Sequence, residues 1–238
     1  MPDFVQLWVY LASAPLFGLT ATLVVYVAVQ SAYERLGRAP WANPVLWSVV
    51  VIGSVLVVTR TPYPTYFAGA QFVHVMLGPA VVALGWPLWL RRDQLRRRGL
   101  ALTVAALCGG LAAAASAVAI GWAFGLGPEM LRSLAPKSVT APVAMGIAER
   151  IGGVPALAAV FAVLTGIVGA LSARRLFDLL GIRSWATRGF ALGTAAHGIG
   201  AARAMQVHPD AGAYAGIAFG LQVVLAALLI PLVVHWAG

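Results

Sequence analysis

Apolar runs of about 20 residues recur along the chain, separated by short connections that carry arginines, prolines or both. A helix of that length crosses a hydrocarbon core about 30 Å thick and satisfies its own backbone hydrogen bonds in lipid. Only 10% of the 238 residues are charged, whereas soluble domains carry about a quarter. The sequence therefore predicts an all-α integral membrane protein that crosses the membrane several times.

The formal net charge of +9 comes from arginines that gather in short clusters between the apolar runs. Five arginines fall within residues 91–98, and smaller zones lie at residues 35–38 and 174–188. Such clusters mark the cytoplasmic side of a membrane protein. We therefore expect all three zones inside, with membrane lipids as partners and no nucleic acid.

The apolar runs and two interrupted stretches predict the architecture. Six runs are expected to form full membrane helices: residues 5–30, 44–59, 71–90, 100–124, 155–173 and 212–237. The stretches 134–146 and 189–205 contain proline, glycine and hydroxyl residues. From the arginine zones we expect the first stretch to enter and leave on the outer side or to cross only in part, and the second could be re-entrant from the inner side. Two crossing, unwound helices are the alternative. We expect a single transmembrane domain over residues 1–238. It should have six to eight membrane helices and two discontinuous or re-entrant segments, arranged as in inverted-repeat transporters.

The first interrupted stretch contains the only lysine of the chain, Lys137. Pro136 and Pro142 lack a backbone donor, so a helix should end here and a new one should start near Thr140, a suitable N-cap. A helix N-terminus, an ammonium group and the hydroxyls of Ser138 and Thr140 together suit a small anion. The alternative is a proline-rich loop at the membrane surface with a solvated lysine.

The second interrupted stretch places Thr194, His197, Gly200 and Arg203 at three-residue spacing, which would put them on one helix face. We expect its helix to break near Gly193–Thr194. Arg203 could hold a carboxylate through two parallel hydrogen bonds, and His197 could donate a hydrogen bond or carry a proton near neutral pH. Alternatively, the glycines mark close helix packing and the imidazole binds a neighbouring backbone.

Both stretches supply candidate functional residues. The candidate substrate-binding residues are Pro136, Lys137, Ser138, Val139, Thr140, Thr194, His197 and Arg203, and the candidate hinges are Pro142, Gly152, Gly153, Gly193 and Gly200. Glu149 and His197 are candidates for proton or ion coupling, although Glu149 also fits a counter-ion for Lys137 or an interfacial acid at a helix end. The four histidines are scattered and Cys108 is the single cysteine, so we expect no metal and no cofactor.

Several motifs resemble the LrgB/CidB family of bacterial membrane proteins, from about residue 43 to the C-terminus. The matching motifs are Leu134-Ala-Pro-Lys-Ser-Val-Thr-Ala-Pro-Val-Ala-Met145, Gly152-Gly-Val-Pro155, Thr165-Gly-Ile-Val-Gly-Ala170 and Gly193-Thr-Ala-Ala-His-Gly-Ile-Gly-Ala-Ala-Arg203. The resemblance implies a multi-pass protein of the bacterial cytoplasmic (inner) membrane. It also implies a small LrgA/CidA-like membrane protein as partner and leaves a homo-oligomer open.

The resemblance also implies a substrate class. Family members that act with an LrgA/CidA-like partner are linked to pyruvate uptake, and the plastid relative exchanges glycolate and glycerate. The resemblance thus implies a transporter of small 2-hydroxy or 2-oxo monocarboxylates: glycolate, glycerate, lactate or pyruvate.

The family's older description gives the alternative function, an antiholin-like regulator of murein hydrolase export and cell lysis without a substrate. Such a regulator needs packing surfaces but no converging buried cations. A membrane enzyme is disfavoured, because the sequence has neither a Ser/His/Asp arrangement nor a phosphate-binding loop. The positions of Lys137 and Arg203 separate these hypotheses, since a shared central cavity favours transport and opposite surfaces disfavour it.

Overall fold

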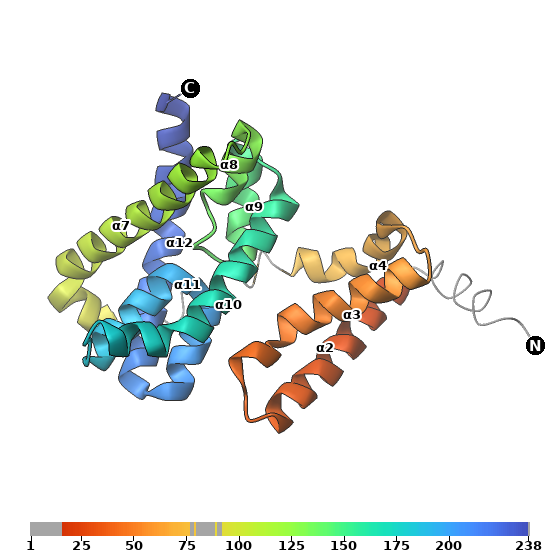
Figure 1. The fold of residues 1–238 in the computed structure, drawn as a ribbon, viewed down its shortest axis with the longest axis horizontal. Coiled ribbons are helices and arrows are strands. Elements are labelled where there is room, and N and C mark those ends of the chain that lie inside the picture. The colour runs from red at the N-terminus through yellow and green to blue at the C-terminus, as the bar shows by residue number, and fades with distance from the viewer. Residues whose placement is uncertain (1–15, 77–78, 80–88, 90–91, 238) are drawn as a thin grey trace, which may run out of the picture. The chain divides into compact units, whose positions relative to one another are not determined.

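The computed structural model describes residues 16–76, 79, 89 and 92–237 (Figure 1). Within these ranges the chain forms helices and turns and contains no β-strand, which confirms the all-α prediction. The chain divides into two compact units, residues 1–80 and 81–238. The single domain expected over the whole chain stays a prediction.

The described residues of the first unit form three α-helices and one short 3₁₀-helix: α2 (Phe17–Arg35), η1 (Pro40–Ala42), α3 (Pro44–Val58) and α4 (Tyr63–Val75). Helix α3 starts after Asn43, whose side-chain oxygen accepts hydrogen bonds from the amides of Val45 and Leu46, as an N-cap does. Helices α2 and α4 pack closely, because a Cβ atom placed on Gly18 would lie 2.1 Å from the Tyr66 carbonyl oxygen.

Over residues 92–237 the second unit forms six helices: α7 (Arg92–Ala123), α8 (Pro128–Leu134), α9 (Ala141–Arg150), α10 (Pro155–Leu179), α11 (Trp185–Val207) and α12 (Pro209–Ala237). Helices α7, α10 and α12 are long and apolar enough to cross a membrane, and α3 is a shorter apolar helix. The expected runs 5–30 and 71–90 lie partly outside the described residues. The total of six to eight membrane helices therefore stays a prediction.

Helix α11 is two helical arms joined by a sharp turn. Ala196 and His197 have non-helical backbone angles, and His197 has a φ of 42°. The chain folds back there, because a Cβ atom on Gly200 would lie 2.7 Å from the carbonyl oxygen of Leu192. Each arm of about ten residues rises about 15 Å, half of a hydrocarbon core. The segment is therefore a re-entrant hairpin with its tip at Ala196–His197.

The break predicted near Gly193–Thr194 is present, but it lies two to three residues further along the chain. The hydroxyl of Thr194 donates to the Phe190 carbonyl oxygen over 2.9 Å, within a regular helical turn. Gly193 instead permits close packing, since a Cβ atom there would lie 2.2 Å from the Ala215 carbonyl oxygen. The glycine thus serves the contact between α11 and α12, and the break occurs beyond it.

The other interrupted stretch lies where the sequence predicts it. Helix α8 ends at Leu134, and α9 begins at Ala141 with Thr140 in the N-cap position. The chain returns to its entry point, because the Ser133 hydroxyl accepts a 2.7 Å hydrogen bond from the amide of Val154. Residues 134–154 therefore form a second re-entrant segment. Its first arm consists of turns up to Thr140, and its returning arm is helix α9.

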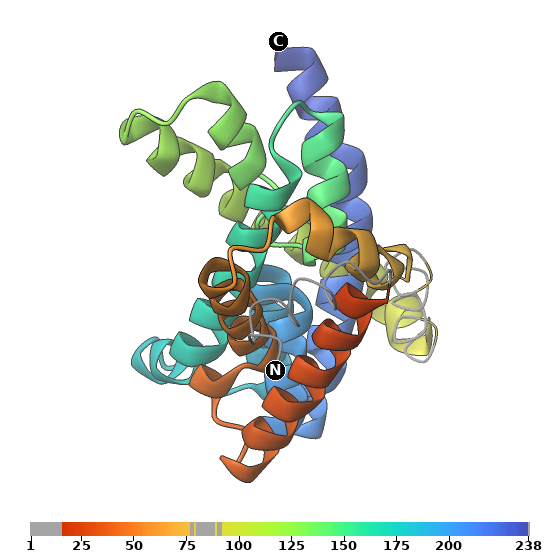
Figure 2. The same ribbon diagram turned by 90° about the vertical axis from the view of Figure 1, so that its right-hand side faces the viewer.

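The two re-entrant segments enter from opposite ends of the unit. Helix α9 packs against Ala226 in the C-terminal half of α12, whereas α11 packs against Ala211 and Ala215 in its N-terminal half. Figure 2 shows α9 and α11 beside different parts of α12. The tips meet, since a Cβ atom on Gly198 would lie 3.7 Å from Cγ2 of Thr140. This confirms the opposed discontinuous segments, while the inverted repeat itself stays a prediction.

The arginine zones of this unit lie at the end where α12 begins. Residues 92–98 form the first turns of α7 rather than a loop, and Arg98 donates a 3.5 Å hydrogen bond to the Tyr214 hydroxyl of α12. Arg188 pairs with Asp178 at 2.5 Å, between α10 and α11. Helix α12 then runs to the other end of the unit (Figure 1). Residue 237 therefore lies at the end opposite the arginines.

Candidate functional site

The candidate site lies where the tips of the two re-entrant segments meet inside the second unit. Each tip is held by a long helix, because Ala144 and Ala148 of α9 and Ala196 of α11 are fully buried among small residues of α10 and α12. Small residues allow helix backbones to approach closely in a membrane protein. The packing thus places irregular backbone in the interior, where it is tolerated only if it lines a cavity or is buried in protein.

Lys137 lies at this meeting point. Its side chain is half-buried, and its Nζ donates a 3.4 Å hydrogen bond to the hydroxyl of Ser138. Among the described residues no carboxylate forms an ion pair with it. The ammonium lies within electrostatic range of the His197 side chain. A cation with no protein counter-ion in an apolar interior is an expensive arrangement that a bound anion would stabilise.

His197 fixes the tip of the hairpin to α10. Its Nε2 lies 2.8 Å from the carbonyl oxygen of Ala162. A carbonyl oxygen only accepts, so Nε2 carries the proton and Nδ1 is the free ring nitrogen. The side chain is 3% exposed. This backbone bond is the structural alternative considered from the sequence, and it stabilises the strained positive φ of the residue.

The start of α9 brings a helix N-terminus to the same place. Thr140 occupies the N-cap position, but its hydroxyl makes no capping bond. That hydroxyl oxygen is buried and has no hydrogen-bond partner among the described residues. Pro142 follows within the first turn, where its missing donor costs no helical hydrogen bond. The helix N-terminus favours negative charge, and its unused hydroxyl is available to a ligand.

The predicted hinge glycines divide into two groups. Gly152 has a φ of 73° directly after α9, and the amide of Gly153 donates 2.8 Å to the Ala148 carbonyl oxygen, which closes the helix. Gly153 also lies against Ser133, since a Cβ atom there would be 2.9 Å from the Ser133 amide nitrogen. Gly193 and Gly200 lie instead in regular arms of α11 and serve close packing.

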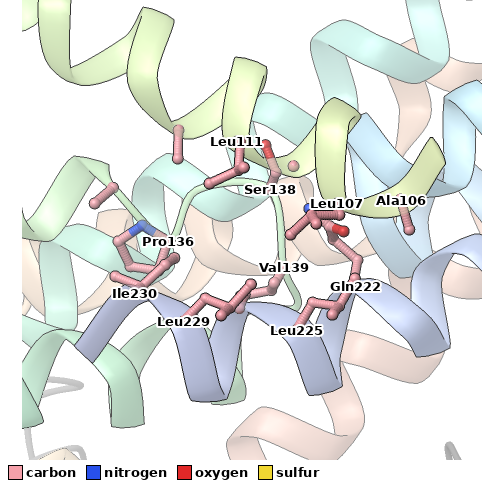
Figure 3. A pocket seen from close by; sticks show the side chains of 14 residues that line it. Ala106, Leu107, Leu111, Pro136, Ser138, Val139, Gln222, Leu225, Leu229 and Ile230 are labelled. Atoms are coloured by element: carbon pink, nitrogen blue, oxygen red, sulfur yellow. The ribbon is translucent and has the colours of Figure 1, made fainter. Parts of the chain in front are cut away.

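A cavity of about 40 Å³ lies beside the first tip, between α7, the residues before α9 and α12 (Figure 3). It has room for a few water-sized groups. Its walls are mostly apolar, and the polar side chains in them are Ser138 and Gln222. Pro136 and Val139 line it, whereas Lys137 does not. Since Lys137 donates to Ser138, the ammonium lies next to the cavity wall rather than within the cavity.

Gln222 is a site residue that the sequence motifs do not indicate. This glutamine is 4% exposed in the middle of α12. Its side-chain oxygen is buried and has no hydrogen-bond partner among the described residues. A signal for it is present in the sequence, because Gln222 is a single amide within residues 215–230, which are otherwise apolar. Polar residues in such helices face the bundle interior and mark functional positions.

The remaining candidates lie outside the immediate meeting point. The Thr194 hydroxyl is used within its own helix, and Arg203, at the far end of the second arm, donates 3.4 Å to Gln206. The turn at residues 196–197 breaks the continuous face on which Arg203 was expected. Glu149 is exposed in the last turn of α9, as an interfacial acid would be. The roles of these residues in binding or coupling stay predictions.

No group of three or more His, Cys, Asp or Glu side chains that could hold a metal ion occurs in the part of the chain that the structure describes. His208 lies 3.9 Å from Asp210 at the base of the α11 hairpin, away from the tips. The groups gathered at the tips are an ammonium, an imidazole, hydroxyls, an amide and a helix N-terminus. This set can bind a small anion with an additional oxygen function.

The fold and site together define an all-helical membrane protein whose interior holds two opposed broken segments. The sequence matches the LrgB-like family over residues 22–236. The chain therefore belongs to the LrgB-like family, and the match begins about 20 residues before the resemblance seen in the motifs. This membership confirms the family indicated by the motifs around Lys137 and His197.

The relatives cover nearly the whole chain. The uncharacterized protein YxaC of Bacillus subtilis is 32% identical over 213 residues, which is 90% of this chain and 92% of the relative. The holin-like protein CidB of Staphylococcus epidermidis is 26% identical over 90% of this chain and 93% of its own length. The holin-like protein CidB of Staphylococcus aureus is 25% identical over 98% of both chains. No solved structure matches the chain.

Proposed function

We propose that this protein transports small 2-hydroxy or 2-oxo monocarboxylates, such as glycolate, glycerate, lactate and pyruvate, across the bacterial cytoplasmic membrane. We further propose that it acts with a small LrgA/CidA-like membrane protein. The carboxylate would bind between the ammonium of Lys137 and the N-terminus of α9. The oxygen at C2 would face the hydroxyl and amide groups of the adjacent cavity.

One observation carries this proposal. Lys137 is half-buried at the meeting point of two re-entrant segments and has no ion-pair partner among the described residues. Secondary transporters bind substrate near the midplane between discontinuous helices, with helix N-termini directed at anionic groups. A protein that only packs against partners gains nothing from an uncompensated interior cation, which costs free energy.

The alternative function is an antiholin-like regulator of murein hydrolase export and cell lysis. The Staphylococcus relatives are named holin-like, which favours it. Such a regulator requires a surface for assembly, and large apolar side chains on α7, α10 and α12 are exposed in the isolated chain. The two functions differ in one measurable property, because only the transporter moves a solute in a purified system.

Uptake into proteoliposomes tests the proposal. The protein is reconstituted alone and together with an LrgA/CidA-like partner, and entry of labelled glycolate, lactate and pyruvate is measured against protein-free liposomes. Saturable uptake of at least one acid is expected, with competition by the unlabelled acid. Uptake no greater than in protein-free liposomes, with and without the partner, would contradict transport and leave the assembly function as the remaining hypothesis.

A further inference from the structure

The cavity in Figure 3 is lined by a residue that carries an unused hydrogen-bond acceptor. Ser138 reaches it from the first re-entrant segment, and Gln222 reaches it from α12. Both side chains are more than nine-tenths buried, at 6% and 4% exposed. The Ser138 hydroxyl already accepts from Lys137, whereas the Gln222 Oε1 has no partner among the described residues. Buried amide oxygens are rarely left without a donor.

The structure provides space for the Gln222 amide. A Cβ atom on Gly110 of α7 would lie 1.9 Å from Gln222 Nε2 and 2.9 Å from its Oε1. The absence of a side chain at Gly110 therefore allows the amide to lie between α7 and α12. The free volume of about 40 Å³ beside it admits a fragment of a few atoms. A ligand group that enters must be small and must donate a hydrogen bond to Oε1.

We propose that Gln222 selects 2-hydroxy over 2-oxo monocarboxylates, because its Oε1 accepts a hydrogen bond from the C2 hydroxyl of the substrate. This inference rests on the proposed transport function. The carboxylate lies at Lys137, and Ser138, which the ammonium contacts, joins that position to the cavity. A hydroxyl at C2 donates to Oε1, whereas a keto oxygen at C2 has no proton to donate and would face it as a second acceptor.

The test compares lactate, pyruvate and propionate, which differ at C2 by a hydroxyl, a keto oxygen or no oxygen. Binding to the purified full-length protein, with its partner if uptake requires one, is measured by calorimetry. The wild type should bind lactate at least about fivefold more tightly than pyruvate or propionate, as expected for one buried hydrogen bond. Gln222→Leu should abolish this preference and leave pyruvate affinity within about twofold of the wild type.

Gly110→Ala provides an independent variant. The added methyl group should displace the end of the Gln222 side chain and reduce the lactate preference without changing Gln222 itself. Gln71→Leu is the matched control, because Gln71 is exposed on α4 and its Nε2 donates to Ala68 of the same helix. The preference of Gln71→Leu for lactate over pyruvate and propionate should equal that of the wild type.

Each outcome has a defined meaning. If the wild type binds lactate and pyruvate equally, or if Gln222→Leu keeps the wild-type preference in a folded protein, the assignment to Gln222 is wrong and transport stands. A cavity that holds only water gives this result. If the wild type binds none of the three acids, the proposed function fails and this inference fails with it.

Discussion

His197 Nε2 donates a 2.8 Å hydrogen bond to the carbonyl oxygen of Ala162, and this bond fixes the tip of one re-entrant hairpin to a membrane-spanning helix. His197→Ala should lower the free energy of unfolding by about 1–3 kcal/mol, because it removes a buried hydrogen bond together with the packing of the ring. Thermal unfolding in detergent measures this loss. His235→Ala is the control, since that ring is exposed in the last turn of α12, and a His197→Ala midpoint no lower than that of His235→Ala would contradict the structural role.

Gly166 allows α10 to lie directly against the hairpin. A Cβ atom there would be 2.8 Å from Ile199 Cδ1 and 3.0 Å from His197 Cε1. Gly166→Ala should destabilise the fold by about 1–3 kcal/mol through overpacking. Gly146→Ala is the matched control, because nothing lies within 4 Å of its Cβ position and alanine favours a helix. Equal melting temperatures for the two variants would show that the hairpin does not pack here as described.

The sequence predicts the re-entrant segments because proline and glycine residues mark the places where their helices are interrupted. Pro136 and Pro142 exclude a regular helix, so the break before Thr140 is placed correctly. The second break is displaced to Ala196–His197, because helix propensity cannot distinguish a glycine that ends a helix from one that admits a neighbour. The contact of Gly193 with Ala215 is tertiary, so the local sequence does not reveal it.

The candidate site is predicted only in part for a similar reason. Lys137 and His197 stand out because charged and polar residues are rare in apolar segments. Arg203 fits a three-residue spacing, but that spacing describes one face only if the helix continues, and the hairpin turn interrupts it. Gln222 lies far from both motifs in the sequence and reaches the cavity because α12 passes behind the first tip.

The topology has a consequence for chemical labelling. Arginines 96 and 183 lie near the end where α12 begins, whereas Trp236 lies at its other end. With Cys108 replaced by alanine, cysteines at positions 96 and 183 should resist an impermeant thiol reagent added outside intact cells. A cysteine at position 236 should react. Labelling of position 96 or 183 together with 236 would contradict the placement of the two ends.

A substitution at Thr140 tests whether its buried hydroxyl has a structural role or a role in substrate binding. Thr140→Val keeps the shape and removes a hydroxyl that has no protein partner among the described residues. The variant should be as stable as the wild type or more stable, because no hydrogen bond is lost. Substrate affinity should fall by about two- to tenfold if the hydroxyl binds the carboxylate. Thr187→Val on the exposed first turn of α11 is the control, and an unchanged affinity in Thr140→Val would exclude that contact.

The central claim is that the Lys137 ammonium binds the carboxylate, and uptake by Lys137→Ala tests it most directly. Labelled glycolate uptake is measured in proteoliposomes that contain equal amounts of monodisperse wild type, Lys137→Ala or the exposed control Arg174→Ala. Loss of a charge-assisted hydrogen bond costs about 1.5–3 kcal/mol, so the apparent affinity of Lys137→Ala should fall about ten- to a hundredfold. Arg174→Ala should transport normally. Wild-type uptake by Lys137→Ala would contradict the account.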